Sequence, residues 1–479
     1  RTDARAMLGR TANALYWMFR YLERAENTAR LLEAGSPHEA WAIVGADELI
    51  GLIGVTVDEA ERTNAAVQEL GEAGRRIGDV VRLITDIAEL TTVDPEGRVL
   101  TDAAVVVEDE RIAWIGPAAD APDADDRVSV EGRAVLPGWV DSHTHLVFDG
   151  DRSAEFEARM AGESYAAGGI GVTTSATRAA SDDRLAELVR GRVADAVAGG
   201  TTYLETKTGY GLTVEEEARH ARLLAGLREE GLVDEVTFLG AHLVPPGRDA
   251  EDYLDDVVGP MLEAVREHAG WVDVFCDTGA FDAEQTRRVL AAGVAAGLGV
   301  RLHGNQIEQG PGVGVAVEFG AASVDHVNHL SDADVEGLAG TWAGWDRASA
   351  TGTPGTVAGC LPACDLSTRA PLAPARRLLD AGIEVSLASN CNPGTSYTTS
   401  MNFNVGTAVL QMHLTLAEAV RAATLGGAIG LRAQDRVGSL EVGKRADLHV
   451  LDAPAAIHLA YRPGMPLTHA VWRAGRRAV

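Results

Sequence analysis

The residues of this chain that could do chemistry begin with two histidines, His143 and His145, which close the apolar run VLPGWVDSHTH. Alternate residues of a β-strand point to the same side, so both imidazoles can reach one ion. Neutral imidazole is a common ligand for transition metals. The spacing alone is weak evidence, because two unrelated polar residues in a loop would look the same. It indicates a metal site only if further histidines lie at neighbouring strand ends.

Three more histidines end or follow apolar runs elsewhere in the chain. His303 ends GVRLHGN, His242 ends VTFLGAH and His326 stands in VDHVNHL. Any one of them alone is explained as well by a hydrogen-bonded histidine in the core. The chain has only 13 histidines, however, so their repeated placement at strand ends argues against scatter. We therefore predict a polar cup that binds a metal ion, with these three histidines as candidates for the third ligand.

A polar turn follows the apolar run EVSL, in the segment ASNCNPGTS. Asn-Pro-Gly is a turn sequence, and its backbone N–H groups could hold a carboxylate or a carbonyl oxygen. A mononuclear hydrolytic site commonly adds a carboxylate to its histidines. The residue at this strand end is Asn390 rather than Asp, so the side chain offered there is a neutral amide.

Three further side chains could bind a substrate or a second ion. Arg152, in FDGDR, could form a two-pronged salt bridge with a substrate carboxylate, although a solvated surface charge explains it equally well. Tyr210 stands in the loop-like segment KTGYG. Lys207 could in principle be carbamylated and bridge two metal ions, which is the less favoured interpretation.

The elements that must position these residues alternate between strands and helices over residues 136–437. Apolar runs such as TTYLETK and VDVFCD are separated by helical stretches such as AEQTRRVLAAGVAAG. Such alternation predicts a parallel sheet, and about eight repeats predict a closed α/β barrel. Working residues of a β/α barrel lie at the carboxyl ends of its strands, which is where this sequence puts its histidines.

The ends of the chain have a different character. Residues 87–135 and 438–479 contain short β runs with Gly turns, and we expect them to form one small β-sandwich domain. Residues 1–86 are predicted to be a helical extension: 11–34 have an apolar face, and 57–86 carry a weak heptad seam. Two helices that pack on another surface explain this pattern better than a dedicated signalling or partner helix.

Composition excludes several classes of function. The formal net charge of −28 disfavours binding to nucleic acid. No stretch is long and apolar enough to span a membrane, and no secretory signal opens the sequence. The four cysteines are expected to be free thiols in a reducing compartment. We expect a cytoplasmic protein that acts on a small molecule without nucleic acid or membrane, with a homodimer as a possible assembly.

From about residue 87 onward, the sequence resembles the imidazolonepropionases, histidine-degrading enzymes of the amidohydrolase superfamily. The resemblance rests on segments that cover about four fifths of the chain: LPGWVDSHTHLVFDGDRSAEFEARMAG, ETKTGYGLTVEEE, VTFLGAHLVPP, LHGNQ, AASVDHVNHLSD, CNPGTSYTTSM and GSLEVGKRADLHVLD. It implies a metal-dependent TIM barrel with one zinc or iron ion. The implied reaction is the hydrolysis of 4-imidazolone-5-propanoate to N-formimidoyl-L-glutamate.

The resemblance also implies roles for individual residues. The metal ligands would be His143, His145, His303 and position 390. The substrate contacts would be Arg152, Tyr210, His242, Gln306, Asn392, Gly394 and Thr395. Catalysis would involve His326, Gln306, His242 and Asn390, with His242 and His326 placed to polarise the carbonyl or to stabilise the oxyanion.

The sequence departs from the family in three places. The family motif Thr-Asp-Cys-Asn-Pro-Gly here reads Ser-Asn-Cys-Asn-Pro-Gly, with Asn390 in place of Asp. Residues 340–359 are longer than the family's loop. The N-terminal residues resemble fragments of an alpha-E helical domain and of a chemoreceptor signalling helix, and are expected to have lost their parent functions.

Asn390 leaves the activity of the chain open, because an amide cannot accept a proton and is a weaker ligand than a carboxylate. We expect weak hydrolysis with substrate binding retained. The alternatives are an amidohydrolase that acts on another cyclic amide or amine, a ligand-binding homologue with little catalysis, and a helical N-terminal module that carries the barrel as a passenger.

Overall fold

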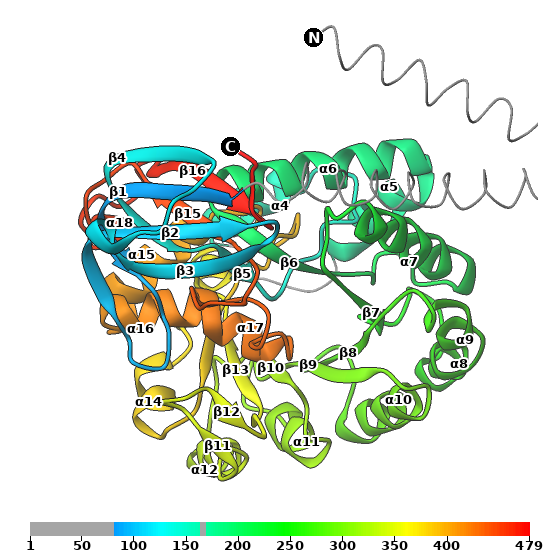
Figure 1. Cartoon of the computed structure of the whole chain (residues 1–479). Coiled ribbons are helices and arrows are strands. Elements are labelled where there is room, and N and C mark those ends of the chain that lie inside the picture. Colours follow the sequence, from blue (N-terminus) through cyan, green and yellow to red (C-terminus); the bar gives the residue numbers. More distant parts are fainter. Residues whose placement is uncertain (1–80, 163–168) are drawn as a thin grey trace, which may run out of the picture. The chain divides into compact units, whose positions relative to one another are not determined.

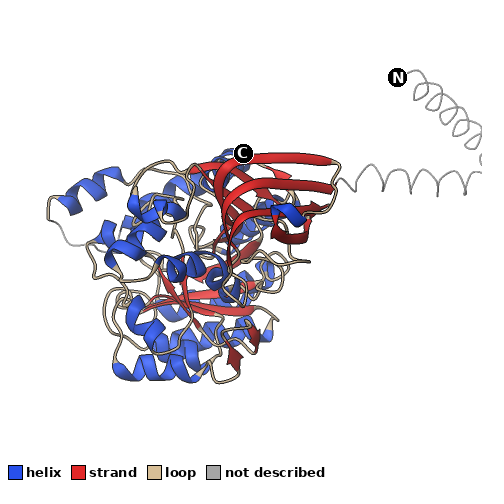
Figure 2. Ribbon diagram, turned by 60° about the vertical axis from the view of Figure 1, so that its left-hand side comes forward, coloured by secondary structure: helices blue, strands red, loops and turns tan. Residues whose placement is uncertain are grey.

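The computed structural model describes residues 81–162 and 169–479, which form a barrel and an adjoining sheet (Figure 1). The predicted helices at 11–34 and most of 57–86 lie outside the described residues. Figure 2, coloured by secondary structure, shows the long strands of the adjoining sheet and the helices around the barrel. The α/β class, the barrel and a separate β domain built from both flanks are observed as predicted, and this β domain is a single sheet.

The barrel contains eight parallel strands in the order β14-β13-β10-β9-β8-β7-β6-β5. Their bounds are β5 (Trp139–Asp141), β6 (Thr201–Lys207), β7 (Glu235–Ala241), β8 (Trp271–Cys276), β9 (Gly299–Gly304), β10 (Ser323–His326), β13 (Val357–Cys360) and β14 (Val385–Leu387). The segments after β5 and β14 close the ring. Asn390 N donates to His143 O and His145 N donates to Cys391 O, both at 2.9 Å. Closure therefore brings the His-x-His segment against the Asn-Cys-Asn-Pro-Gly turn.

Helices cover the outside of the barrel. They are α4 (Ser153–Met160), α5 (Ile170–Ala179), α6 (Asp182–Ala198), α7 (Val214–Glu229), α8 (Ala250–Asp256), η3 (Val257–Met261), α9 (Leu262–Val265), α10 (Ala283–Ala295), α11 (Gly312–Glu318), α12 (Asp332–Gly340), α13 (Pro362–Thr368), α14 (Ala375–Asp380), α15 (Met401–Gln411), α16 (Leu416–Arg421), η4 (Ala422–Gly426) and α17 (Gly427–Gly430). Ser181 and Thr213 begin α6 and α7 by accepting backbone N–H groups at their first turns.

The second sheet combines strands from both ends of the described chain. Its order is β17-β16-β15-β4-β1-β2-β3. The strands are β1 (Val81–Thr91), β2 (Val99–Glu108), β3 (Arg111–Pro117), β4 (Asp126–Pro137), β15 (Leu448–Leu451), β16 (Thr468–Arg473) and β17 (Arg476–Arg477), with η1 (Ala118–Asp120) and α18 (His458–Tyr461) beside them. The junction between the two chain ends is the antiparallel pair β15 and β4. A single sheet with a core of its own thus spans the residues that flank the barrel.

One boundary predicted from the sequence is wrong. Residues 81–86 were assigned to the helical extension, but they form the first half of β1. Leu83 and Ile84 are buried there, and β1 pairs with both β2 and β4. A short run of β-branched and apolar residues fits a helical or a strand period, and pairing with two neighbours decides in favour of the strand.

Residues 340–359, which are expected to be longer than the family's loop, also have a defined structure. They form the small antiparallel hairpin of β11 (Trp345–Asp346) and β12 (Thr351–Gly352) between α12 and β13. The indole N–H of Trp342 donates to Thr356 O at 3.2 Å, so the base of the hairpin is anchored to the barrel.

Candidate active site

A pocket opens at the carboxyl ends of the barrel strands and contains most of the residues selected from the sequence. It encloses about 490 Å³ including its open mouth. Its lining is His145, Arg152, Ile170, Tyr210, His242, Leu243, Phe275, His303, Gln306, His326, Asn390, Asn392 and Thr395. None of these described lining residues is an aspartate or a glutamate.

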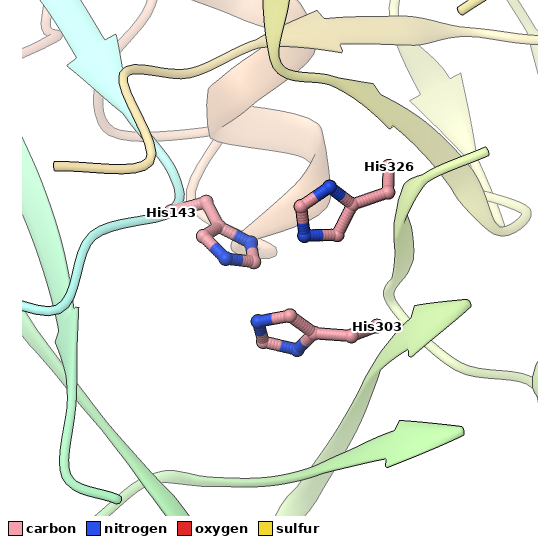
Figure 3. A group of neighbouring side chains, drawn as sticks. All are labelled: His143, His303 and His326. Atoms are coloured by element: carbon pink, nitrogen blue, oxygen red, sulfur yellow. The ribbon is translucent and has the colours of Figure 1, made fainter. Parts of the chain in front are cut away.

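Three histidine nitrogens meet at the floor of this pocket. The Nε2 atom of His145 lies 3.2 Å from Nε2 of His143 and 3.4 Å from Nε2 of His303. The first two residues follow β5, and the third is on β9. Figure 3 shows the rings of His143, His303 and His326 facing a common centre.

The hydrogen bonds of the outer ring nitrogens fix the tautomers. His143 Nδ1 lies 2.7 Å from Asp325 Oδ2, and His303 Nδ1 lies 2.9 Å from Asp273 Oδ1. A carboxylate accepts, so each Nδ1 carries the proton and each Nε2 presents a lone pair to the pocket. Lone pairs that face one another repel, unless a cation lies between them. Tetrahedral ligands at about 2.0–2.1 Å from a zinc ion would stand about 3.3–3.4 Å apart, so these residues fit a divalent metal ion.

His326 is a fourth histidine at the same place. One of its ring nitrogens lies within 4.8 Å of ring nitrogens of His143 and His303. Its Nδ1 atom is buried and has no hydrogen-bond partner among the described residues. Burial, and next the nearby His303, lower the pKa of His326 well below its usual value. The Nε2 distances of 3.2 and 3.4 Å favour His145 as the third ligand, and His326 lies beside the site.

A buried lysine supports Asp273, one of the two orienting carboxylates. Lys207 Nζ lies 2.9 Å from Glu205 Oε1 and 3.0 Å from Asp273 Oδ2. Burial acts to raise the pKa of Asp273, but the neighbouring His303 and Lys207 outweigh this effect and hold that pKa below its usual value. A carbamate on Lys207 would be anionic and would repel both carboxylates. These two ion pairs favour an unmodified lysine, and the carbamylated bridge between two ions stays the less favoured interpretation.

Asn390 lines the pocket beside the histidines, as its sequence position suggested. Its backbone N–H holds His143 O, and its φ is +51°. The side chain is almost fully buried, and Oδ1 has no hydrogen-bond partner in the described part of the chain. A buried carbonyl oxygen that is left unpaired costs about 1–3 kcal/mol, so this atom suits contact with a metal ion or a substrate N–H.

His242 differs from the expectation that it polarises the substrate carbonyl. Its Nδ1 lies 2.9 Å from Gly209 O, and a carbonyl can only accept, so Nδ1 carries the proton. Burial lowers the pKa of His242 to about 4, and the ring is therefore neutral at pH 7. Its Nε2 atom can accept a hydrogen bond but cannot donate one, which suits a ring N–H of a substrate rather than a carbonyl oxygen.

The Asn-Pro-Gly turn uses its N–H groups internally. Asn392 Oδ1 accepts from Gly394 N at 2.9 Å and from Thr395 N at 2.8 Å. The amide of Asn392 donates to Asn390 O at 2.7 Å. The expectation that these backbone groups hold a substrate carboxylate is therefore not met. Asn392 instead fixes the turn, and Gly394 leaves room for the guanidinium of Arg152, which a Cβ would overlap.

The remaining predicted contacts surround the pocket. Tyr210 follows β6, and its ring lies 5.5 Å from that of His242. Gln306 follows β9, and its backbone N–H donates to Asp277 Oδ2 at 2.6 Å. Arg152 is buried at the start of α4 and binds Glu155. Sequence reasoning missed Asp273, Asp325 and Glu155, although an aspartate inside an apolar strand run is a visible signal for the first two.

Comparisons with known proteins show the family of the chain. Residues 134–475 match the model of the amidohydrolase family. An imidazolonepropionase of Micrococcus luteus is 99% identical over 397 residues, which cover 83% of this chain and 99% of that protein. The imidazolonepropionase of Paenarthrobacter aurescens is 67% identical over 405 residues, 83% of this chain and 98% of the relative.

The chain belongs to the imidazolonepropionases of the amidohydrolase family. Solved amidohydrolase-like structures show the same fold at lower identity. An adenosine deaminase from Xanthomonas campestris with bound zinc has a TM-score of 0.61 at 20% identity and covers 83% of this chain and 92% of its own. An atrazine chlorohydrolase from Arthrobacter aurescens complexed with zinc has a TM-score of 0.63 at 17% identity. The match covers 83% of this chain and 94% of that structure's chain.

Two other findings concern the parts around the barrel. Residues 7–88 match the model of a predicted alpha-helical domain with a conserved ER motif, in line with the resemblance of these residues to an alpha-E domain. Within the described residues, no helix is long and apolar enough to cross a membrane.

Proposed function

We propose that this chain hydrolyses 4-imidazolone-5-propanoate to N-formimidoyl-L-glutamate at a single metal ion held by His143, His145 and His303. The main support for the proposal is the close approach of three Nε2 atoms: that of His145 lies 3.2 Å from that of His143 and 3.4 Å from that of His303. Asp325 and Asp273 orient the rings of His143 and His303. Membership of the imidazolonepropionases supports this reaction. The pocket offers histidines for a metal ion and an arginine for the substrate carboxylate. Asn390 Oδ1 would be the fourth protein contact.

A metal ion at these histidines would supply a bound water of lowered pKa and would polarise the ring carbonyl. We favour zinc, because the solved relatives named above are described with zinc, and iron is the alternative that metal analysis would reveal. The neutral histidines and the neutral amide hold the site without adding a negative charge, in contrast to the carboxylate at position 390 in the family motif.

The proton has to be moved by a histidine in this chain. The described pocket lining has no carboxylate, and His326 has one ring nitrogen at the histidine cluster. We assign to His326 the proton taken from the attacking water and returned to the ring nitrogen that leaves. The carbonyl carbon gains the water oxygen and the ring C–N bond breaks. The leaving nitrogen takes the proton and becomes the imino nitrogen of the formimidoyl group, which stays attached to the other ring nitrogen. The new carboxylic acid releases its own proton to the solvent and becomes a carboxylate.

The other pocket residues would orient the substrate. His242 accepts a ring N–H at Nε2, because its Nδ1 proton is already committed to Gly209 O. Arg152 binds the propanoate, and Phe275 and Leu243 cover the ring. This arrangement favours a ring that carries an N–H and an acidic side chain over an uncharged cyclic amide or amine.

The experiment is a comparison of substrates with product analysis. The purified full-length chain, loaded with zinc, should convert imidazolonepropanoate to formimidoylglutamate and leave the same imidazolone ring without the carboxylate largely untouched. Conversion of the uncharged ring at an equal kcat/KM would favour an amidohydrolase for another ring. Tight binding of imidazolonepropanoate without conversion would instead favour a ligand-binding homologue, the role that Asn390 supports.

The setting of the enzyme is part of the proposal. All four cysteines are free and buried, which fits a reducing compartment such as the cytoplasm. The net charge of −28 opposes binding to nucleic acid. A homodimer stays a prediction.

A further inference from the structure

Arg152, the residue assigned to the substrate carboxylate, is already held by an acidic side chain. Its Nε atom donates to Glu155 Oε2 at 2.8 Å, and its Nη2 atom donates to Glu155 Oε1 at 2.7 Å. The two residues are three apart, at the first turn of α4. The side chain of Arg152 is 5% exposed and that of Glu155 is 30% exposed, so the two-pronged bridge is partly shielded from water.

The backbone around this pair leaves the guanidinium little freedom. A Cβ at Gly169 would overlap Glu155 Oε2 and Arg152 Nη2, and a Cβ at Gly394 would overlap Arg152 Nη1. Glycines at both places let the chain pack directly against the ion pair. The guanidinium is thus held on its Nε–Nη2 edge by Glu155 and lies at Nη1 against the pocket turn at 392–395.

The third nitrogen of the guanidinium is the one left for a ligand. No hydrogen bond of Arg152 Nη1 occurs among the described residues, and Arg152 lines the pocket. Arg159 adds a second positive charge at this wall, because its Nη2 atom donates to Gly394 O at 2.9 Å and its Nη1 atom lies 3.7 Å from Glu155 Oε1. Two arginines and one glutamate leave a net charge of +1, so Glu155 does not cancel the attraction for an anion.

We propose that Glu155 is a positioning residue, which fixes Arg152 so that Nη1 faces the pocket and grips the acidic side chain of the substrate. The inference rests on the proposed function for the identity of that side chain. Without the two hydrogen bonds to Glu155, the guanidinium of Arg152 could rotate. The substrate carboxylate would then meet an arginine without a fixed orientation, and the contact would be less specific. Glu155 would then set the affinity for the carboxylate without touching the reacting ring.

The rival explanation predicts the opposite change in affinity for the carboxylate when Glu155 is removed. If Glu155 merely occupies Arg152 in place of the substrate, its removal would free the guanidinium and tighten carboxylate binding. The test therefore uses Glu155→Gln, which keeps the length of the side chain but removes its charge. Glu157→Gln is the matched control, since Glu157 is exposed on the same helix and makes no hydrogen bond with Arg152 among the described residues.

Two probes separate positioning from general damage. Imidazole-4-propanoate carries the acidic side chain, and 4-propylimidazole has the same chain length without the carboxylate. For Glu155→Gln, we expect the inhibition constant of the first probe to rise by about tenfold or more, as for the loss of a charge-assisted contact. The inhibition constant of the second probe and those of both probes with Glu157→Gln should stay within about twofold.

Kinetics and a second variant complete the experiment. In Glu155→Gln, KM for imidazolonepropanoate should rise while kcat changes little. For Glu155→Asp, whose side chain is one methylene shorter, KM and the inhibition constant of imidazole-4-propanoate should lie between those of Glu155→Gln and wild type. Unchanged or tighter binding of imidazole-4-propanoate would overturn the inference, as would an equal loss for both probes. If wild type binds this probe but never opens the imidazolone ring, the proposed function fails while the binding data still decide the role of Glu155.

Discussion

Asn390→Asp is the substitution that tests most sharply how this active site differs from the family motif. The two side chains have nearly the same shape, and the backbone is held by the hydrogen bond from Asn390 N to His143 O at 2.9 Å. The change therefore adds a charge and a proton acceptor without a change in packing. The new carboxylate oxygen would take the place of Asn390 Oδ1, an atom that has no hydrogen-bond partner among the described residues.

The expected gain in rate is large. A well-placed general acid–base group contributes about 10²–10⁴ in rate, or about 3–5 kcal/mol in the barrier. In the metal-loaded protein, kcat for imidazolonepropanoate should rise by that factor in Asn390→Asp, with a smaller change in KM because Arg152 and Tyr210 are untouched. Single-turnover measurement of ring opening at saturating substrate separates this step from product release.

Stability provides an independent readout of the same substitution. Burial already raises the pKa of the nearby Asp141 to about 7, so a second buried carboxylate would be costly without a counter-ion. Without metal, Asn390→Asp should unfold at a lower temperature than wild type at pH 8, by an amount that corresponds to about 3 kcal/mol. Zinc should reverse the order. Equal kcat values for the two metal-loaded proteins would refute the reasoning, because they would show that a carboxylate at position 390 adds nothing to the proton transfer assigned to His326.

Three further outcomes are expected. Asp273→Asn should weaken zinc affinity by about 10–100-fold, because His303 would lose its fixed tautomer; competition with a chelator measures this, and unaltered affinity would remove the orienting role. His220 is buried, and burial lowers its pKa to about 4 in the folded protein. In the unfolded chain the histidine pKa is about 6.5, so between pH 6.5 and pH 4 the unfolded chain binds more protons than the folded one. Between pH 6.5 and pH 4, the free energy of unfolding of the wild type should therefore fall by up to about 3 kcal/mol more than that of His220→Leu. Equal pH slopes for the two proteins in chemical denaturation would contradict this. A chain that begins at residue 80 should keep the melting temperature of the barrel, whereas one that begins at 87 loses buried Leu83 and Ile84 and about 4 kcal/mol; equal melting of the two would show that the first half of β1 is dispensable.

Most of the fold could be predicted because its signals are local. Apolar strands that alternate with helices specify a β/α barrel, and strand-end histidines show where its working face lies. The start of β1 could not be located this way, since residues 81–86 fit either period until β2 and β4 pair with them. Strand identity there depends on partners that come later in the chain.

The histidines of the site could be predicted from residue type, whereas their states could not. The proton on His242 Nδ1 is fixed by Gly209 O, which lies 33 residues away. The carboxylate that orients His143 belongs to Asp325, which lies 182 residues away and approaches only when the barrel closes. Glu155 and Asn392 have local partners, but their roles depend on which atoms face the pocket, and spacing along the sequence does not specify that.

The central claim is that one metal ion at His143, His145 and His303 makes ring opening possible. Its most direct test is titration of the metal-free full-length chain with zinc, with bound metal and imidazolonepropanoate turnover measured on the same samples, beside His303→Ala. The account predicts that turnover rises with bound zinc, reaches its maximum at about one ion per chain, and is lost in His303→Ala together with tight metal binding. Full turnover in the metal-free chain, or undiminished zinc binding by His303→Ala, would contradict it.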